Sequence, residues 1–156
     1  PLSVLTEAFD ASLTWNAATG VVAVTRGSGA LTPADQYYNQ DDLFWLSRVI
    51  YAESGNQPLE GMMAVGNVVL NRVNDPIYPN TIVGVLSQKN QFTTYRSGKL
   101  AGCTPNASSV AAAKLVLDGA VVEKTKNALY FDSAPNSWAA RNRTCIAVIG
   151  GHRFYA

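Results

Sequence analysis

The chain has 156 residues, of which 47% are hydrophobic and only 15% are charged, and its formal net charge is +1. This length and composition predict one globular domain that buries most of its apolar surface, with a small appendage. No basic run indicates a nucleic acid partner, no acidic tail indicates disorder, and no apolar run approaches the roughly 18 residues of a membrane span. We therefore expect a monomer with no nucleic acid partner and no membrane span.

Residue types that bind metals are scarce. Cys103 and Cys145 have neither CxxC spacing nor a partner cluster, and His152 is the single histidine. A zinc site needs about four such ligands, so neither a metal nor another cofactor is predicted. Nothing near either cysteine indicates the activated thiolate of a Cys-His protease. A disulfide between the cysteines and a pair of free thiols both remain open, because spacing alone does not test geometry.

Residues 12–26 have the pattern of a β-hairpin. Strands are predicted over 13–16 and 21–25, the second rich in β-branched residues, and 26–29 form a linker. The hairpin resembles the end of the small β modules called copper amine oxidase N-terminal-like domains, a resemblance too short to imply copper. A lone hairpin is marginally stable in water. We therefore expect residues 1–30 to be the tail of a larger module or to pack on the main domain.

A helix predicted over residues 43–53 carries an unusual acid. Asp41 and Asp42 occupy its first turn, where negative charge suits the helix N-terminus. Within roughly 120° of arc, one face carries four hydrophobes and one carboxyl group: Leu43, Leu46, Val49, Ile50 and Glu53. Desolvation and the unpaired carbonyls of a helix C-terminus both raise the pKa of such a carboxyl group. Glu53 is thus a candidate proton donor, unless the helix ends earlier and the side chain points into solvent.

A second helix is predicted from Pro58, which fits the first helical position, to about Val73. Apolar residues surround this helix on nearly all sides, which is typical of a central, buried helix. Gly66 allows a neighbouring element to approach closely. Asn71 and Arg72 are expected to close internal hydrogen bonds, because buried polar groups need partners.

Three segments follow this helix: a short helix, a polar loop and a longer helix, over residues 81–86, 89–95 and 107–117. The loop either lines a cleft or is an ordinary surface loop. Gly119 closes the longer helix in the C′ position.

The C-terminal part differs in kind. Residues 128–131 and 146–149 have strand patterns, and 150–151 form a turn into 152–155. Helices followed by a small antiparallel sheet indicate an α+β fold.

Several segments agree in order and spacing with one known family. They are residues 48–55, 60–73, 78–82, 91–93, 127–131, 138 and 149–155. On these residues the chain resembles the bacterial cell wall hydrolase family that includes the spore cortex-lytic enzymes. The resemblance implies a lysozyme-like catalytic domain over 41–156, which cleaves the glycan strands of peptidoglycan, commonly as a lytic transglycosylase.

Glu53 matches the catalytic glutamate of this family. The pair Glu53-Ser54 is also found in lytic transglycosylases more widely, where it ends the catalytic helix. Residues 54–58 read Ser-Gly-Asn-Gln-Pro, whereas the family often has Ala-Arg-Gly-Glu-Pro, so loop contacts to the sugar are expected to differ. Neither cysteine belongs to the family pattern.

One carboxyl group is sufficient for a lytic transglycosylase, because the C6 hydroxyl of the muramic sugar acts as the nucleophile and a 1,6-anhydro product forms. We therefore predict cleavage of the bond between MurNAc and GlcNAc, with Glu53 as the single general acid/base. A muramidase-type hydrolase is the alternative and needs a second carboxylate. Asp132 is the only candidate for it beside a family motif. A non-catalytic peptidoglycan-binding module is a further alternative, which needs no protonatable carboxyl group.

The predicted substrate-binding residues are Ser54, Gln91, Phe92, Thr93, Tyr130, Trp138, His152 and Tyr155. Gln91 and Thr93 are candidates for holding the N-acetyl or C6 hydroxyl groups, and Tyr130 for a hydrogen bond to the sugar or to Glu53.

Three of these residues have an open alternative. Trp138 and Tyr155 either form walls on which sugars stack or belong to the core. His152 either orients a group of the cleft or is a structural histidine.

Localisation follows from the substrate rather than from a targeting segment. The first residue is Pro1, so we interpret the sequence as a piece of a longer protein, and a missing signal segment is uninformative. A peptidoglycan substrate implies secretion to the cell envelope or the spore cortex.

Overall fold

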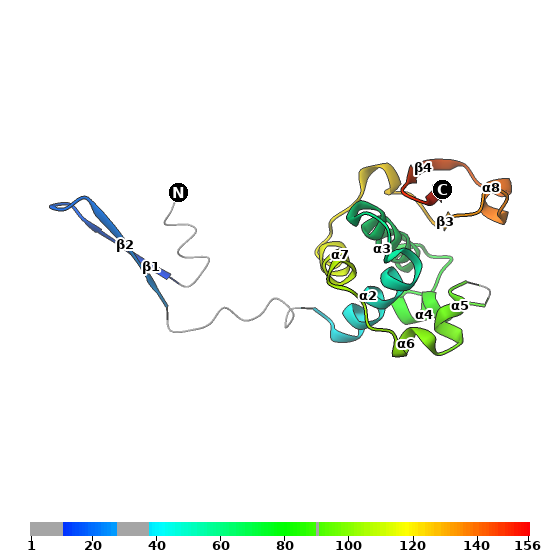
Figure 1. The fold of residues 1–156 in the computed structure, drawn as a ribbon, viewed down its shortest axis with the longest axis horizontal. Helices are drawn as coiled ribbons and strands as arrows, with labels where there is room; N and C mark the ends of the chain where they lie inside the picture. The colour runs from blue at the N-terminus through cyan, green and yellow to red at the C-terminus, as the bar shows by residue number, and fades with distance from the viewer. Residues whose placement is uncertain (1–10, 28–37, 90) are drawn as a thin grey trace. The chain divides into compact units, whose positions relative to one another are not determined.

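The computed structural model describes residues 11–27, 38–89 and 91–156, and the chain divides into two units, Pro1–Tyr37 and Tyr38–Ala156. Figure 1 labels the helices and strands along the chain. In order they are β1 (Ala11–Asn16), β2 (Val21–Arg26), α2 (Gln40–Ser54), α3 (Leu59–Asn74), α4 (Ile82–Ser87), α5 (Thr93–Arg96), α6 (Lys99–Gly102), α7 (Ala107–Leu117), the 3-10 helix η2 (Glu123–Thr125), β3 (Tyr130–Asp132), α8 (Trp138–Asn142), β4 (Cys145–Ile149) and β5 (His152–Tyr155).

The first unit contains the predicted hairpin. Strands β1 and β2 pair antiparallel, and Asn16 closes the turn by accepting backbone hydrogen bonds with its side-chain oxygen. The cross-strand pair Trp15 and Val22 is exposed, with Trp15 60% accessible. The rest of the predicted N-terminal segment, residues 1–10 and 28–30, lies outside the described residues.

Helix α2 begins and ends close to the predicted positions. Asn39 caps its N-terminus, where the side-chain oxygen accepts from the backbone N–H groups of Asp41 and Asp42 at 2.9 and 3.2 Å. The helix continues to Ser54, so Glu53 lies in its last turn rather than in a loop.

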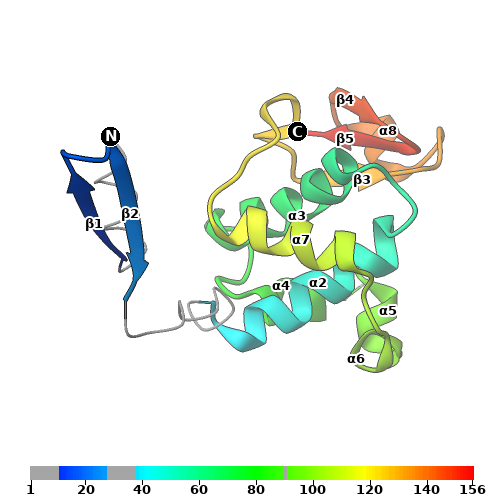
Figure 2. The ribbon, with the colours of Figure 1, turned by 60° about the vertical axis from the view of Figure 1, so that its left-hand side comes forward.

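Helices α2, α3 and α7 pack against one another and form the centre of the second unit (Figure 2). Helix α3 is buried on most sides, as predicted. A Cβ atom added at Gly66 would lie 3.0 Å from Ile50 Cδ1 and 3.3 Å from Val116 Cγ2, so glycine sets the close approach of the three helices. The predicted start of α3 is one residue early, because Pro58 has an extended ψ of 155° and caps the helix instead of entering it.

Short helices flank this centre. The predicted helix over 81–86 is present as α4, where the Thr81 hydroxyl caps the N-terminus. The loop predicted over 89–95 is wrong in its second half, because Thr93–Arg96 form the helical turn α5. Tertiary packing accounts for the difference, since the ring of Tyr95 in this turn packs edge-on against Trp45 of α2 at 5.1 Å.

The C-terminal sheet has the strand order β3-β5-β4, with all neighbours antiparallel. The predicted turn between β4 and β5 is confirmed, and Gly150 adopts a φ of +56°, which favours glycine. The expected α+β fold, a lysozyme-like helical core with a small antiparallel sheet, is therefore confirmed.

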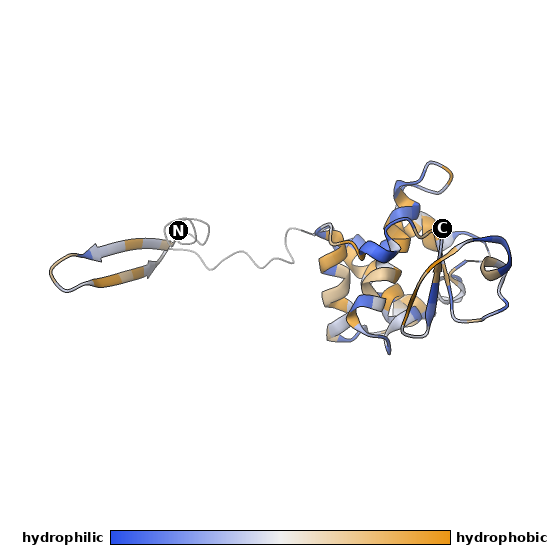
Figure 3. Cartoon of the chain, turned by 90° about the horizontal axis from the view of Figure 1, so that it is seen from above, coloured by the Kyte–Doolittle hydropathy of each residue, from blue (hydrophilic) through white to orange (hydrophobic). Residues whose placement is uncertain are grey.

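Two apolar clusters hold this unit together. One fills the space between α2, α3, α4 and α7, and the other lies between α3 and the sheet. Figure 3 shows apolar residues concentrated on the central helices and polar residues along the loops beside the sheet. Helix α3 contributes to both clusters and so connects the helical core to the sheet.

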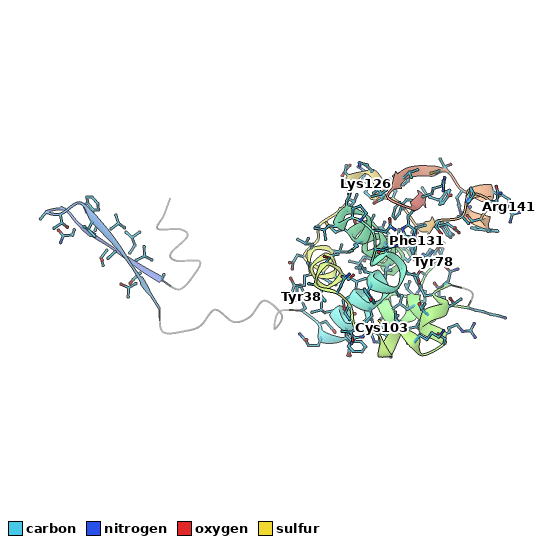
Figure 4. All side chains as sticks on the ribbon, viewed as in Figure 1. Tyr38, Tyr78, Cys103, Lys126, Phe131 and Arg141 are labelled. Carbon is cyan, nitrogen blue, oxygen red and sulfur yellow. The ribbon has the colours of Figure 1, made fainter. Side chains whose placement is uncertain are left out.

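The cysteines are not paired. Cys103, labelled in Figure 4, follows α6 and is half-buried. Cys145 begins β4 and is exposed. The disulfide that the sequence left open is therefore absent from the structure. In the part of the chain that the structure describes, no helix has the length and apolarity to cross a membrane.

Candidate active site

Glu53 opens onto a cavity of about 800 Å³ between the helices and the sheet. Its neighbours on the same helical face, Leu46, Val49 and Ile50, are fully buried, whereas Glu53 is half-buried. The predicted apolar face is thus confirmed, and its last member borders the cavity. The cavity is lined by Glu53, Arg72, Ile77, Tyr78, Lys89, Gln91, Phe92, Thr93, Tyr130, Phe131, Asp132, Trp138 and Ala139.

Burial raises the pKa of the Glu53 carboxyl group above its ordinary value. A hydrogen bond from Thr94 acts in the opposite direction and offsets part of this effect: Thr94 Oγ1 donates to Glu53 Oε1 at 3.4 Å. A carboxyl group that keeps its proton nearer to neutral pH is suited to general acid catalysis.

The segment that follows Glu53 is fixed from two sides. Asn106, the cap of α7, donates a side-chain hydrogen bond to the carbonyl of Gly55 at 3.2 Å. Gln57 accepts the backbone N–H of Gly151 at 2.7 Å and so ties the segment to the turn between β4 and β5. Ser54 is fully buried, and its hydroxyl donates to the carbonyl of Ile50 at 2.8 Å. Ser54, a predicted substrate-binding residue, therefore faces the backbone of its own helix and does not line the cavity.

The floor of the cavity contains a buried arginine. Arg72 of α3 is 3% exposed, donates from Nε to the carbonyl of Leu129 at 2.7 Å, and donates from Nη1 to Gln91 Oε1 at 2.8 Å. Asn71 beside it donates to backbone carbonyls of the connection before β3. The expected internal hydrogen bonds are confirmed, and Arg72 also positions the predicted site residue Gln91.

The segment 91–93 borders the cavity as predicted. Gln91 and Thr93 line it together with Phe92, which is 5% exposed and belongs to the helical core cluster. Gln91 and Thr93 offer an amide and a hydroxyl group to a ligand.

Two tyrosines in the lining of the cavity, Tyr78 and Tyr130, form a hydrogen-bonded pair. Tyr78 Oη donates to Tyr130 Oη at 3.0 Å, and Arg143 Nη2 donates to Tyr130 Oη at 3.5 Å. Burial and the hydrogen bond to Tyr130 raise the pKa of Tyr78 to about 12. The hydrogen bond from Tyr78, followed by that from Arg143, lowers the pKa of Tyr130. Tyr130 therefore lines the cavity as predicted, with Tyr78 and not Glu53 as its hydrogen-bond partner.

The three residues whose roles the sequence left open, Trp138, Tyr155 and His152, differ in their burial and in their position relative to the cavity. Trp138 lines the cavity, is 53% exposed, and lies 5.6 Å from the ring of Tyr130. Tyr155 is 2% exposed because it lies on the central strand β5, and it does not line the cavity. His152 is 8% exposed, packs edge-on against Phe131 at 5.6 Å, and does not line the cavity either. Burial lowers the pKa of His152.

Asp132, the candidate second carboxylate, lines the same cavity as Glu53. Its Oδ1 atom accepts the backbone N–H of Ala134 at 2.6 Å. Asp132 Oδ1 therefore fixes the backbone at the end of β3. Asp132 Oδ2 accepts no hydrogen bond from the described residues.

Four residues that form hydrogen bonds at the site were not predicted as site residues from the sequence: Arg72, Tyr78, Thr94 and Arg143. Tyr78 and Arg72 stand within family segments, and Thr94 adjoins one, so motif membership was an available signal. For Arg143 no sequence signal exists, because its contacts to Tyr130 and Trp138 arise from the fold alone.

A half-buried carboxyl group at the end of a core helix, above an aromatic cavity closed by a small sheet, is an arrangement of lysozyme-like glycan-cleaving domains. The chain belongs to the cell wall hydrolase family, whose model matches residues 56–155. Glu53 lies just before the matched segment.

Curated relatives and solved structures agree with this assignment. The chain is 35% identical over 120 residues to the spore cortex-lytic enzyme of Bacillus cereus, a match that covers 75% of this chain and 45% of the relative. It is 33% identical over 122 residues to that of Oceanobacillus iheyensis, covering 76% of this chain and 43% of the relative. The chain thus spans less than half the length of these relatives.

Among solved structures, the chain is similar to the catalytic domain of the germination-specific lytic transglycosylase SleB from Bacillus anthracis. The TM-score is 0.68 at 33% identity, covering 76% of this chain and 97% of that one. The catalytic domain of the Bacillus cereus SleB protein matches with a TM-score of 0.67 at 32% identity, covering 83% of this chain and 100% of that one.

Proposed function

We propose that this protein cleaves the glycan strands of peptidoglycan between MurNAc and GlcNAc by a lytic transglycosylase mechanism. The observation that carries the proposal is Glu53, a half-buried carboxyl group of raised pKa that borders an aromatic cavity. Similarity to a solved catalytic domain described as a lytic transglycosylase supports the same chemistry.

One carboxyl group performs both proton transfers. Glu53 donates its proton to the glycosidic oxygen, the bond from C1 to that oxygen breaks, and GlcNAc leaves with a free hydroxyl group. The carboxylate then accepts the proton of the C6 hydroxyl group of the muramic sugar, while O6 forms a bond to C1. Glu53 regains its proton and no water is consumed, so the product is a 1,6-anhydro sugar.

The neighbouring groups support this sequence of steps. Thr94 orients the Glu53 carboxyl group through its hydroxyl hydrogen bond. Gln91 and Thr93 offer polar groups for the N-acetyl or C6 hydroxyl groups of the sugar, with Gln91 held by Arg72. Trp138 supplies an exposed aromatic face on which a sugar ring can stack.

A muramidase-type hydrolase is the second candidate, because Asp132 borders the same cavity as Glu53. Hydrolysis would use Asp132 either to activate water or to stabilise the glycosyl cation. The two candidates differ in their products, since hydrolysis adds one water to each cleaved bond and transglycosylation adds none.

Mass spectrometry of the soluble products from purified peptidoglycan tests the proposal. Anhydromuropeptides support the transglycosylase, and reducing ends support the hydrolase. Retention of the protein on sacculi without any release of fragments would identify a non-catalytic binding module and overturn the proposal. Vegetative sacculi and spore cortex, assayed in parallel, determine which material is preferred.

The setting of the enzyme follows from this substrate. We propose that residues 41–156 act as the catalytic domain of a secreted monomer in the cell envelope or the spore cortex. The hairpin within residues 1–30 is then the tail of a larger module. Sedimentation analysis tests the monomer, and peptidoglycan cleavage by residues 38–156 alone tests the independence of the domain.

A further inference from the structure

One arginine in the lining of the cavity, Arg72, has no acidic partner among the described residues. Arg72 is 3% exposed and lines the cavity, and its guanidinium group is held by a backbone carbonyl and by the neutral amide of Gln91. No carboxylate of the described residues forms an ion pair with it. A buried charge is ordinarily paired, because leaving water is costly. Arg72 therefore provides an uncompensated charge directed at the cavity.

A second guanidinium group also lies beside the ring of Tyr130. The Cζ atom of Arg143 is 5.2 Å from the ring centroid of Tyr130 and 5.1 Å from that of Trp138. Arg72 Cζ is 5.3 Å from the same Tyr130 centroid. Two like charges thus lie close to one ring, and Arg143 also has no ion-pair partner among the residues described. Arg143 is exposed, packs against two aromatic rings and donates long hydrogen bonds to the carbonyl of Asn142 at 3.4 Å and to Tyr130 Oη at 3.5 Å.

The acids near the cavity do not neutralise this pair. Asp132 uses Oδ1 to hold the backbone of Ala134 and makes no salt bridge to either arginine within the described chain. Glu53 has a raised pKa through burial and is bound by Thr94. Lys89 adds a further positive group to the lining. Among the described residues, no acid therefore pairs with Arg72 or Arg143.

We propose that Arg72 and Arg143, both of which lie beside the ring of Tyr130, form a subsite that binds a carboxylate of the glycan substrate. The inference rests on the proposed function and extends it to a charged substituent outside the bond that is cleaved. A guanidinium group presents paired donors that match the two oxygens of a carboxylate. The hydroxyl group of Tyr130, which accepts hydrogen bonds from Tyr78 and Arg143, adds a further polar group beside the arginines.

Two parts of peptidoglycan supply this chemistry. Stem peptides carry free carboxylates, and a muramic sugar without its peptide exposes the carboxylate of its lactyl group. The shared chemistry is a carboxylate attached near the sugar ring, and the choice of substrate separates the two sources.

The test uses Arg143→Gln, because Arg143 is exposed and its loss leaves the core intact. Arg143→Lys keeps the charge but removes the paired donors. The matched control is Arg141→Gln, which removes an exposed arginine from α8 that points away from the domain (Figure 4) and does not line the cavity. The half-saturation concentration and the maximal rate of each protein are measured on three substrates. These are intact peptidoglycan, peptidoglycan whose carboxylates have been amidated with carbodiimide and ammonia, and glycan strands stripped of peptide.

On intact peptidoglycan, Arg143→Gln is expected to raise the half-saturation concentration on the order of fivefold, the scale of an exposed ion pair, with little change in maximal rate. Arg143→Lys should lie between this variant and the wild type, and Arg141→Gln should match the wild type. On amidated peptidoglycan the difference between Arg143→Gln and wild type should disappear. If the difference persists on stripped strands, the subsite also accepts the lactyl carboxylate that stripping exposes. If it is lost there, the stem peptide alone supplies the carboxylate.

An equal effect of Arg143→Gln on intact and amidated substrate, or no effect on either, would overturn the subsite. Failure of the proposed function gives a different result, since no protein in the series would then release fragments from any substrate. Melting temperatures close to that of the wild type verify that the variants are folded.

Discussion

Glu53→Gln separates the catalytic role of this carboxyl group from its effect on stability. Glutamine has nearly the same shape, still accepts the hydrogen bond of Thr94 through its amide oxygen, and cannot transfer a proton. A structural role for Glu53 would make the substitution harmful to folding, whereas a catalytic role predicts loss of activity in a stable protein.

The expected loss of activity is large. Removing a general acid typically lowers the rate by about 10²- to 10⁴-fold. Here both proton transfers pass through one carboxyl group, and the hydroxyl nucleophile belongs to the substrate. The initial rate of fragment release from peptidoglycan should therefore fall at least about 10³-fold.

The expected change in stability has the opposite sign. Burial raises the pKa of Glu53 in the folded state above the unfolded value, so the folded state binds the proton more tightly than the unfolded state does. This effect destabilises the wild type fully above the folded pKa and disappears as pH falls below the unfolded pKa. Glu53→Gln should consequently unfold at the same or a higher temperature than wild type at pH 8, and the difference should vanish under acidic conditions.

Thermal unfolding followed by circular dichroism over this pH range, together with the rate of peptidoglycan cleavage, measures both effects. Glu60→Gln is the matched control, because Glu60 is an exposed glutamate whose ion pair with Lys124, at 3.0 Å, lies on the surface. It should keep wild-type activity and change stability by less than about 0.5 kcal/mol. Cleavage by Glu53→Gln at a wild-type rate would refute the assignment. A marked loss of its stability at pH 8 would refute the reasoning about its burial.

Three further predictions concern the surroundings of the carboxyl group. Thr94→Val removes the hydrogen bond that lowers the pKa of Glu53, so the alkaline limb of the pH profile of kcat/KM should move to higher pH. Thr94→Ser keeps the hydroxyl group and should leave this limb in place. A move of the limb to lower pH in Thr94→Val would contradict the prediction. Gly66→Ala should lower the free energy of unfolding, measured in urea, by about 1–3 kcal/mol, because the added Cβ atom would meet buried side chains. Gly102→Ala is the control, because a Cβ atom there would have no neighbour within 4 Å. Equal stability of the two variants would show that the helices move apart without cost. Trp138→Ala should raise the half-saturation concentration for glycan strands without altering thermal stability, because this ring is exposed at the cavity. An unchanged half-saturation concentration would exclude Trp138 as a surface on which sugars stack.

Local patterns predicted the elements that carry the chemistry. The apolar periodicity of α2 identified Glu53 as an acid on a buried face, and the structure confirms that three neighbours on this face are fully buried. The nearly all-round apolar pattern of α3 predicted its central position. These predictions depend on residues a few positions apart, where the geometry of a helix alone fixes the spacing. Family motifs then added Gln91, Thr93, Tyr130 and Trp138, all of which border the cavity.

The sequence did not reveal burial where it depends on a distant partner. Tyr155 and Ser54 stand in family segments, and their sequence neighbours do not reveal whether the side chains face the cavity or the core. Strand β5 became the central strand of the sheet, and this covered Tyr155. The helical turn at Thr93–Arg96 likewise depends on the packing of Tyr95 against Trp45, a contact across 50 positions of the chain.

By itself, the sequence predicted the α+β class, the helix that carries Glu53, and the family. Only the tertiary structure decided which side chains meet around that carboxyl group. It brought Thr94 to Glu53, and placed Arg72 and Arg143 beside the ring of Tyr130. The physical reason is that helix and strand periodicity acts over a few residues, whereas the charge, burial and hydrogen bonding of a site are set by groups that only folding brings together.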